Sequence, residues 1–333
     1  MSEASKRPIK PINPLPSMKI IRARSLGLCF GVRDAIDLAT REAARRPVTI
    51  LGELVHNDTV LRRLRDSGAQ SADTLDQIRT STVMISAHGT SDRRRRELQD
   101  SGLEVLEATC PLVAHAHQSL QTLVREGWHP VVVGRRDHVE VLGLTGDFAD
   151  FDVILEPSDL DRVRERPRFG VVAQTTQPLP RVQEMVRLLG LRFPRSEVRF
   201  VDTVCQPTKQ RQTAAADMAR SADVVVVIGG FRSNNTRELA ALCRRFCPRV
   251  HQVETAGDLD PAWLRPTDTV GLTAGTSTPD ETVTAVQTWL DRLAHEADHR
   301  PDADSGAFER ETDARFSTKT DAEKAVDAPA VRL

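Results

Sequence analysis

Short, continuous apolar runs recur along the chain, and longer segments with helical periodicity separate them. The runs are rich in β-branched residues and each is followed by a glycine: VTIL at 48–51, VVV at 131–133 and VVVVI at 224–228. Helical spacing of apolar residues is found in the segments 31–46, 111–127 and 207–222. Continuously apolar strands that alternate with helices are typical of parallel sheets with helices on their faces. The pattern therefore predicts an α/β fold.

The same order of features occurs three times along the chain. A strand runs into Cys29, Cys110 or Cys205, a helix follows, and a β-branched strand then ends at a glycine 23, 24 and 24 residues after the cysteine. Each copy continues with an acidic-leucine segment (DTLD, SDLD or GDLD) and closes with another apolar strand. Matched features at near-equal spacing indicate an internal repeat. We therefore predict three pseudo-repeated α/β units with small parallel sheets, at residues 18–108, 109–203 and 204–295.

The two ends of the chain differ from this body. Residues 1–17 contain four prolines and mixed charge, which predicts a flexible lead-in. Residues 296–333 are polar and charged, without sustained apolar periodicity. Such a segment cannot bury enough apolar surface to offset chain entropy, so it is predicted to be a disordered tail.

Composition and charge narrow the class of protein. The 333 residues carry 46 Lys and Arg against 47 Asp and Glu, so the net charge of −1 gives no reason to expect a nucleic acid or a membrane as partner. No apolar run approaches the roughly 20 residues that span a bilayer, and the first residues lack the apolar core of a signal peptide. The chain is expected to be cytoplasmic, where cysteines stay reduced.

Cys29, Cys110 and Cys205 occupy equivalent places in the three units. Each stands between a strand and a helix, where backbone N–H groups and the helix dipole are expected to favour a thiolate. Thiolates bind iron–sulfur clusters or zinc, and three ligands leave one iron of a cluster open for catalysis. The repeat favours one shared centre over three separate buried cysteines, and zinc on three cysteines and a histidine is the alternative. Cys243 and Cys247 fall outside the repeat and are expected to pack in the core.

Polar side chains follow the strands whose carboxyl ends are expected to converge. Ligands of parallel α/β sheets bind beyond these strand ends. The expected ring of binding residues comprises His56, His88, His138, Thr175, Ser233, Asn234, Asn235 and Ser277. Hydroxyl, amide and imidazole groups suit phosphate oxygens. The chain has no Walker motif and no Gly-x-Gly-x-x-Gly after a strand, so a nucleotide is not expected.

Glu140 lies two residues after His138, in the same expected mouth. A carboxyl group beside a desolvated anion tends to keep its proton, so Glu140 is a candidate general acid. A surface glutamate is the alternative, and the residues alone do not separate the two.

Nine fragments, in order, make the chain similar to a known family. They are GLCFGVRDAI, VHN, AHGT, EATCPLV, HVEV, QTT, VCQPTKQRQ, SNNT and TAGTSTP, and they span about residues 19–290. The ordered set resembles 4-hydroxy-3-methylbut-2-enyl diphosphate reductase (HMBPP reductase), an oxidoreductase that catalyses the last step of the methylerythritol phosphate route to isoprenoids.

The resemblance implies three α/β units around one [4Fe-4S] cluster per chain, held by Cys29, Cys110 and Cys205. It implies that a small allylic diphosphate lies among the ring of polar residues, that Glu140 donates a proton, and that Thr175 lies near the substrate hydroxyl. Ferredoxin or flavodoxin would supply two electrons, and water would leave. The implied products of this reductive dehydroxylation are isopentenyl diphosphate and dimethylallyl diphosphate.

The chain departs from the family pattern in the loop that carries Glu140. Val139 stands where the family usually has a proline. This change removes a fixed φ and is expected to loosen the placement of Glu140. A non-catalytic or specialised paralogue that binds a diphosphate or a cluster is therefore the alternative function.

Overall fold

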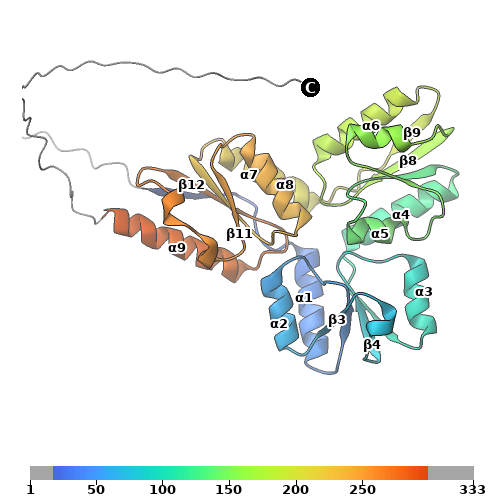
Figure 1. Ribbon diagram of the computed structural model, residues 1–333, viewed down its shortest axis with the longest axis horizontal. Helices are drawn as coiled ribbons and strands as arrows, with labels where there is room; N and C mark the ends of the chain where they lie inside the picture. Colours follow the sequence, from blue (N-terminus) through green and yellow to red (C-terminus); the bar gives the residue numbers. More distant parts are fainter. Residues whose placement is uncertain (1–17, 299–333) are drawn as a thin grey trace, which may run out of the picture. The chain divides into compact units, whose positions relative to one another are not determined.

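Three small sheets make up the described part of the chain. The computed structural model describes residues 18–298, so the predicted lead-in (1–17) and most of the predicted tail (299–333) lie outside the described residues. The predicted start of the tail at residue 296 is wrong, because residues 296–298 continue the helix Asp280–Asp298. Twelve strands within residues 18–298 form three four-stranded sheets in which every strand pair is parallel. The predicted α/β fold with three small parallel sheets is confirmed (Figure 1).

All three sheets place their strands in the same order. The first sheet runs β3 (Gln70–Ala72), β2 (Thr49–Leu51), β4 (Thr82–Ile85) and β5 (Glu104–Glu107). The second runs β7 (Asp152–Ile154), β6 (His129–Val133), β8 (Arg168–Ala173) and β9 (Glu197–Phe200). The third runs β11 (Val250–Val253), β10 (Val224–Ile228), β12 (Thr269–Ala274) and β1 (Lys19–Arg22). The β-branched run and the closing strand of each repeat are thus always the two central strands.

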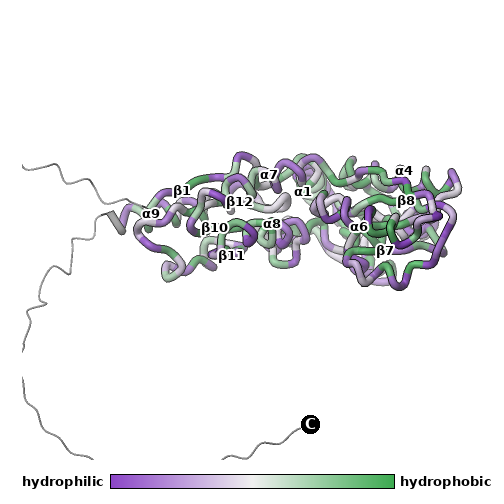
Figure 2. The backbone as a smooth tube through the Cα atoms, turned by 90° about the horizontal axis from the view of Figure 1, so that it is seen from above, coloured by the Kyte–Doolittle hydropathy of each residue, from purple (hydrophilic) through white to green (hydrophobic). Residues whose placement is uncertain are grey.

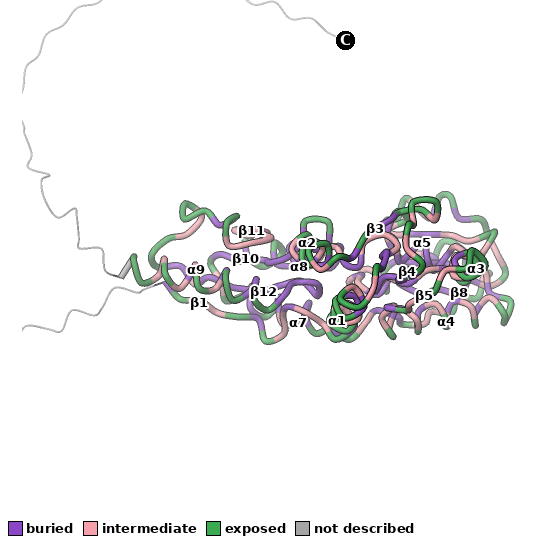
Figure 3. The backbone as a smooth tube through the Cα atoms, turned by 90° about the horizontal axis from the view of Figure 1, so that it is seen from below, coloured by how far each residue is buried: buried purple, intermediate pink, exposed green. Residues whose placement is uncertain are grey.

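Helices pack on the faces of these sheets. They are α1 (Phe30–Ala43), α2 (Asp58–Asp66), α3 (Asp92–Asp100), α4 (Pro111–Arg125), α5 (Val139–Thr145), α6 (Leu179–Arg192), α7 (Gln206–Ala219), α8 (Asn234–Arg244) and α9 (Asp280–Asp298). In Figures 2 and 3, α1, α4 and α7 lie along one side, and Figure 3 shows α2, α5 and α8 along the other. Within residues 18–298, no helix combines the length and the hydrophobicity that a membrane span requires.

The acidic-leucine segments form matching turns in the three units. They are the short 3₁₀ helices η1 (Leu75–Gln77), η2 (Pro157–Arg162) and η3 (Ala256–Asp258), and a fourth, η4 (Pro261–Trp263), follows the last of them. Each of the first three carries a capping box, in which two residues three positions apart exchange hydrogen bonds. The side chain of each one accepts from the backbone N–H of the other. This shared local structure supports the interpretation of the segments as equivalent parts of a repeat.

The core of each sheet lies on both of its faces, because both faces are covered by helices. In β6, Val131 and Val133 pack with Phe169 on one face, whereas Val132 packs with Val172 on the other. Alternate residues of a strand point to opposite faces, so a strand buried on both sides must be apolar throughout. The continuous apolar runs in the sequence have this origin.

The strand that opens the first predicted unit belongs to a different sheet. Residues 19–22 were expected in the unit 18–108, but β1 pairs with β12 at the edge of the third sheet. Ile20 and Ile21 pack into the two apolar clusters on opposite faces of that sheet. A strand of four residues does not specify from its sequence which sheet edge it joins. Its pairing with β12 therefore depends on the packing of Ile20 and Ile21. The boundaries 18–108, 109–203 and 204–295 as separate domains stay a prediction.

Each predicted cysteine stands between one sheet and the helix of the next unit. Cys29 follows β1 of the third sheet, Cys110 follows β5 of the first, and Cys205 follows β9 of the second. The helices that begin at these cysteines are α1, α4 and α7, and each packs with the unit that comes next in sequence. The three thiols therefore mark the three junctions between units.

Replacing Phe169 by alanine tests the contribution of these small cores. Phe169 is fully buried between His129 and Phe193 in the second sheet, so Phe169→Ala is expected to lower the free energy of unfolding by about 3–5 kcal/mol. The control Leu191→Ala removes a side chain that is 64% exposed and should change it by less than about 0.5 kcal/mol. Urea unfolding followed by circular dichroism measures both. Equal effects would contradict the assigned core.

Candidate active site

One cavity between the three units gathers the predicted site residues. All twelve of them line it: Cys29, Cys110, Cys205, Glu140, His56, His88, His138, Thr175, Ser233, Asn234, Asn235 and Ser277. Three further threonines and five apolar residues complete the lining: Thr176, Thr208, Thr276, Val32, Val55, Ala87, Leu112 and Val113. Residues that are up to 248 positions apart thus share one site, as expected for converging strand ends.

The helices around the cavity begin in two different ways. On one side, α2, α5 and α8 are capped by side chains: Asn57 Oδ1 accepts from Val60 N at 3.1 Å, His138 Nδ1 from Glu140 N at 3.1 Å, and Ser233 Oγ from Thr236 N at 3.3 Å. On the other side, the residues that precede α1, α4 and α7 are the three cysteines, and no side chain caps these helices. The thiols are therefore not used to cap their own helices.

Burial controls the protonation of the thiols. It raises the pKa of Cys205 to about 11 and also raises the pKa of Cys110. Hydrogen bonds at the starts of α7 and α4 lower these pKa values, but desolvation outweighs them. The helix starts thus favour the thiolate, as expected, but burial has the larger effect on these two cysteines. Metal binding would have to displace their protons, which couples metal affinity to pH.

The thiols fit a cluster better than a single ion. Cys29 lies near enough to Cys110 and Cys205 to raise the pKa of both through charge repulsion. Within the described residues, however, the group of three potential ligands close enough for one ion consists of histidines and not of the cysteines. Zinc needs all its sulfurs about 2.3 Å from one centre. Three free thiols line one cavity, and thiolates are the usual ligands of iron–sulfur clusters, so the residues present fit such a cluster.

A glycine allows two of the cysteines to approach each other. Gly31 lies in the first turn of α1, two residues after Cys29. A Cβ atom at Gly31 would overlap the sulfur of Cys110 and lie 3.1 Å from its Cβ. Any side chain at this position would therefore displace the thiol from the cavity.

Cys243 and Cys247 lie away from the cavity. Both are buried in the apolar cluster between α7, α8 and the third sheet. They have the packing environment that was expected of them.

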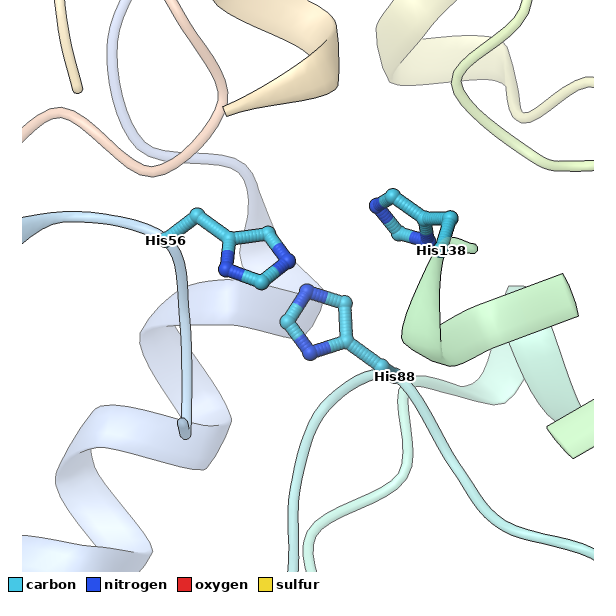
Figure 4. Close-up of side chains that lie close together, drawn as sticks. All are labelled: His56, His88 and His138. Atoms are coloured by element: carbon cyan, nitrogen blue, oxygen red, sulfur yellow. The ribbon is translucent and has the colours of Figure 1, made fainter. Parts of the chain in front are cut away.

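Three imidazoles form a cluster on the other side of the cavity (Figure 4). The rings of His56 and His88 stack with centroids 4.6 Å apart, and His138 meets them edge-on at 5.4 and 5.6 Å. One nitrogen of each ring lies within 4.8 Å of the others. The side chains point toward one another, so a small ligand could contact all three.

Burial keeps two of these imidazoles neutral. Desolvation, with repulsion from His56, lowers the pKa of His88 well below its usual range and that of His138 to about 4. Since His138 Nδ1 accepts from the backbone of Glu140, the proton of its neutral ring is on Nε2. That N–H is available as a donor to a ligand. An anion would stabilise the charged form of these rings and raise both pKa values.

The third unit supplies amide and hydroxyl groups. Asn235 Oδ1 accepts from Thr276 N at 2.9 Å, whereas its Nδ2 and the hydroxyl of Ser277 are buried without a hydrogen-bond partner among the described residues. Asn234 Nδ2 donates to Thr176 Oγ1 at 3.1 Å. Buried polar groups normally have partners. Unpaired donors that line a cavity therefore indicate a place for a ligand with acceptor oxygens.

Glu140 is fully buried and faces the same cavity, so the alternative of a surface glutamate is wrong. Its carboxyl group accepts from Thr175 N at 2.6 Å and from Thr175 Oγ1 at 3.0 Å. Burial nevertheless raises the pKa of Glu140 to about 7. The bonds to His138 and Thr175 hold both the backbone and the carboxyl group of Glu140. A carboxyl group with this pKa can donate a proton near neutral pH.

Two residues near Cys205 were not predicted to belong to the site. Thr208 Oγ1 accepts from Cys205 Sγ at 3.0 Å. Arg211 is buried, and its guanidinium donates to the carbonyl oxygens of Gly27 at 2.7 Å and Leu28 at 3.1 Å. It therefore joins α7 to the loop that precedes Cys29. Their spacing of three and six residues from Cys205 places both within two helical turns of it, which is the signal that could have identified them.

Comparison with known proteins supports one family. The LytB protein family model matches residues 20–291. The 4-hydroxy-3-methylbut-2-enyl diphosphate reductase of Pelobacter propionicus is 37% identical over 266 residues, which cover 79% of this chain and 94% of that protein.

Two solved structures share the fold. A structure of (E)-4-hydroxy-3-methyl-but-2-enyl diphosphate reductase, described as the terminal enzyme of the non-mevalonate pathway, is 33% identical with a TM-score of 0.61, covering 83% of this chain and 99% of that one. The E-1-hydroxy-2-methyl-but-2-enyl-4-diphosphate reductase of Plasmodium falciparum is 26% identical with a TM-score of 0.76, covering 83% and 88%. Since the family model matches nearly the whole described chain, and the bacterial relative is covered almost completely, this chain belongs to the LytB protein family.

Proposed function

We propose that the chain is a 4-hydroxy-3-methylbut-2-enyl diphosphate reductase. The relatives and the solved structures bear this name. The observation that carries the proposal is the single cavity in which three free thiols, a carboxyl group of raised pKa and a cluster of imidazole, amide and hydroxyl groups come together. Removal of the allylic hydroxyl consumes two electrons and two protons and releases one water, giving isopentenyl and dimethylallyl diphosphates.

The thiols of Cys29, Cys110 and Cys205 would hold one [4Fe-4S] cluster per chain. When bound, the cluster would supply one-electron transfer and a Lewis-acidic iron. Three protein ligands suit this role because they leave the fourth iron open. Ferredoxin or flavodoxin is the proposed electron donor.

The diphosphate would lie among the polar groups of the cavity. The Nε2–H of His138 is free to donate, and the buried Nδ2 of Asn235 and hydroxyl of Ser277 lack partners among the described residues. His56, His88, Ser233 and Asn234 would complete the ring. Since these groups come from different units, one diphosphate would hold the units in register and orient the allylic end toward the thiols.

Glu140 would protonate the leaving hydroxyl group. Its carboxyl group lies in the same cavity as the thiols, and its charge repels those of Cys110 and Cys205. The pKa of about 7 makes the protonated form available at neutral pH. Thr175 binds both oxygens of the carboxyl group and would place its hydroxyl beside that of the substrate.

Glu140→Gln tests the assignment of the acid. The change keeps the shape of the side chain but removes the transferable proton, so the turnover number is expected to fall by about 10²- to 10⁴-fold. Turnover is measured anaerobically with reduced methyl viologen, and iron and sulfide contents are measured on the same sample. The control Glu126→Gln changes an exposed carboxyl group at the end of α4 and should leave turnover unchanged. A wild-type protein with full cluster but no turnover would instead support the paralogue.

A pair of glycine substitutions tests the ligand assignment. Gly31→Ala is expected to reduce iron and sulfide content strongly, because its methyl group overlaps the position of the Cys110 sulfur. Gly190→Ala, in α6, meets no atom within 4 Å and should stabilise the helix by about 0.5–1 kcal/mol without changing the cluster. Iron, sulfide and visible absorption after anaerobic reconstitution distinguish the variants. Full reconstitution of Gly31→Ala would disprove the arrangement of Cys29 and Cys110.

Diphosphate binding is expected to take up protons at pH 7. The free protein holds His88 and His138 neutral because their pKa values are low, whereas a bound diphosphate raises them. Affinity must therefore fall as the pH rises through the pKa values of the complex. Calorimetry of substrate binding in buffers of different ionisation enthalpy measures the proton number. Release of protons on binding, or no change in the number of bound protons, would contradict the placement of the diphosphate beside His88 and His138.

A further inference from the structure

A second groove lies outside the active site, between the start of α6 and the helices α7 and α8. It encloses about 820 Å³ and has an apolar lining with a basic rim. The apolar lining includes Leu179, Ala216, Leu242 and the partly exposed Phe246. The rim carries Arg181, Lys209, Arg220 and Arg245, against the single carboxylate of Glu238. Neither the predicted site residues nor the proposed reaction uses this groove.

Two of the four basic side chains of the rim, Arg220 and Arg245, are available to a partner. Arg181 pairs with Glu238 at 2.6 Å, and Lys209 and Arg220 pair with Asp202 and Asp217, which lie outside the groove, at 2.7 and 2.9 Å. The Arg220–Asp217 pair is exposed on both sides, so it contributes little and exchanges easily. Arg245 has no ion pair among the described residues. The groove thus presents positive charge at Arg245 and at the loosely paired Arg220, on a chain whose net charge is −1.

An exposed aromatic ring lies between two of these cations. The guanidinium of Arg220 is 4.3 Å from the ring centre of Phe246, and that of Arg245 is 5.9 Å from it. Phe246 is 36% exposed. Deeper in the groove, Gln212 Nε2 is buried and has no hydrogen-bond partner within the described residues. An apolar centre with aromatic and arginine side chains and a polar rim is typical of protein interaction sites, and the unpaired donor of Gln212 leaves a hydrogen bond open to a partner.

The groove follows the helix that starts at Cys205. Lys209 and Gln212 come four and seven residues after this cysteine, so they lie about 6 and 10 Å from it along the axis of α7. A redox protein seated here would therefore have its contact surface close to a thiol ligand of the proposed cluster.

The other two cysteine-bearing helices lack such a surface. The exposed residues of α1 near Cys29 are the apolar Phe30 and a set of mixed charge: Arg33, Asp34 and Asp37. Those of α4 after Cys110 are nearly neutral: His115, Gln118 and Thr122. Among the three helices that begin at the thiols, α7 is the one with a basic groove along it.

We propose that this groove docks a small acidic electron-transfer protein, which delivers single electrons to the site through α7. The proposal rests on the proposed reductase function, because the reaction consumes two electrons and the chain has no motif for a nicotinamide or flavin nucleotide. A protein that fits a rim of four cations carries carboxylates around its redox centre. Such pairing of opposite charges raises the association rate and weakens with salt.

A charge-reversal pair tests the docking site. Arg220→Glu with Arg245→Glu removes two rim cations, and neither residue lines the active site. The probe is a purified acidic ferredoxin, and its dissociation constant is measured by calorimetry at low and at moderate salt. We expect binding to weaken at least about tenfold and to lose most of its salt dependence. Arg220→Lys with Arg245→Lys keeps the charge and should bind within about threefold of wild type.

Matched controls separate docking from catalysis. Arg62→Glu with Arg65→Glu introduces the same charge change on α2, on the opposite side from α7 (Figure 3), and should leave binding nearly unchanged. In the groove variant, turnover driven by ferredoxin should fall with binding, whereas turnover driven by methyl viologen should stay at the wild-type level. Equal weakening in both double variants, or unchanged binding in the groove variant, overturns the proposal.

Failure of the reductase assignment gives a different result. In that case the wild-type protein shows no turnover with methyl viologen, while the binding measurement still reports on the groove. Wild-type protein that turns over with methyl viologen but binds neither ferredoxin nor flavodoxin would overturn the docking site and leave the reductase assignment intact.

Discussion

The position of each cysteine, after a strand of one sheet and before a helix of the next unit, is the constraint on which the site depends. Cys29, Cys110 and Cys205 follow edge strands of the third, first and second sheets. The three junctions therefore meet at the centre of the three units, although no two of these cysteines are close in sequence. His138 and Ser233, the side-chain caps of α5 and α8, line the same cavity, so the thiols share it with imidazole and hydroxyl groups.

The repeat allowed the sequence to predict most of this arrangement. Near-equal spacing from each cysteine to a glycine, and then to His56, His138 or Ser233, specified equivalent places in three units. Residues at equivalent strand ends lie close together when the three units face one another. The structure accordingly brings all twelve predicted site residues to one cavity. A short strand carries much less information. The pattern of residues 19–22 predicted a strand, but its partner β12 lies about 250 positions away and is chosen by core packing.

Properties that depend on burial were harder to predict. The helix starts at Cys110 and Cys205 suggested thiolates, yet desolvation in the cavity is the larger effect and raises both pKa values. Glu140 could have been a surface residue, and only the packing around Thr175 shows that its carboxyl group is buried. The spacing of Arg211 from Cys205 could have placed it near the site, but its partners could not be predicted, because they are backbone carbonyl groups of residues 27 and 28.

The electrostatics of the cavity couple binding of the proposed cluster and of the proposed diphosphate to changes in the protonation of its side chains. Burial favours the neutral form of five of its groups: the thiols of Cys110 and Cys205, the imidazoles of His88 and His138, and the carboxyl group of Glu140. Arg211 remains charged, and it hydrogen-bonds to carbonyl groups rather than to a carboxylate of the described residues. A cluster on three thiolates would place negative charge near this cation, and a diphosphate would do so beside the imidazoles. Each ligand would therefore favour the charge state that binds it, and the raised pKa of Glu140 would leave this carboxyl group able to donate a proton near neutral pH.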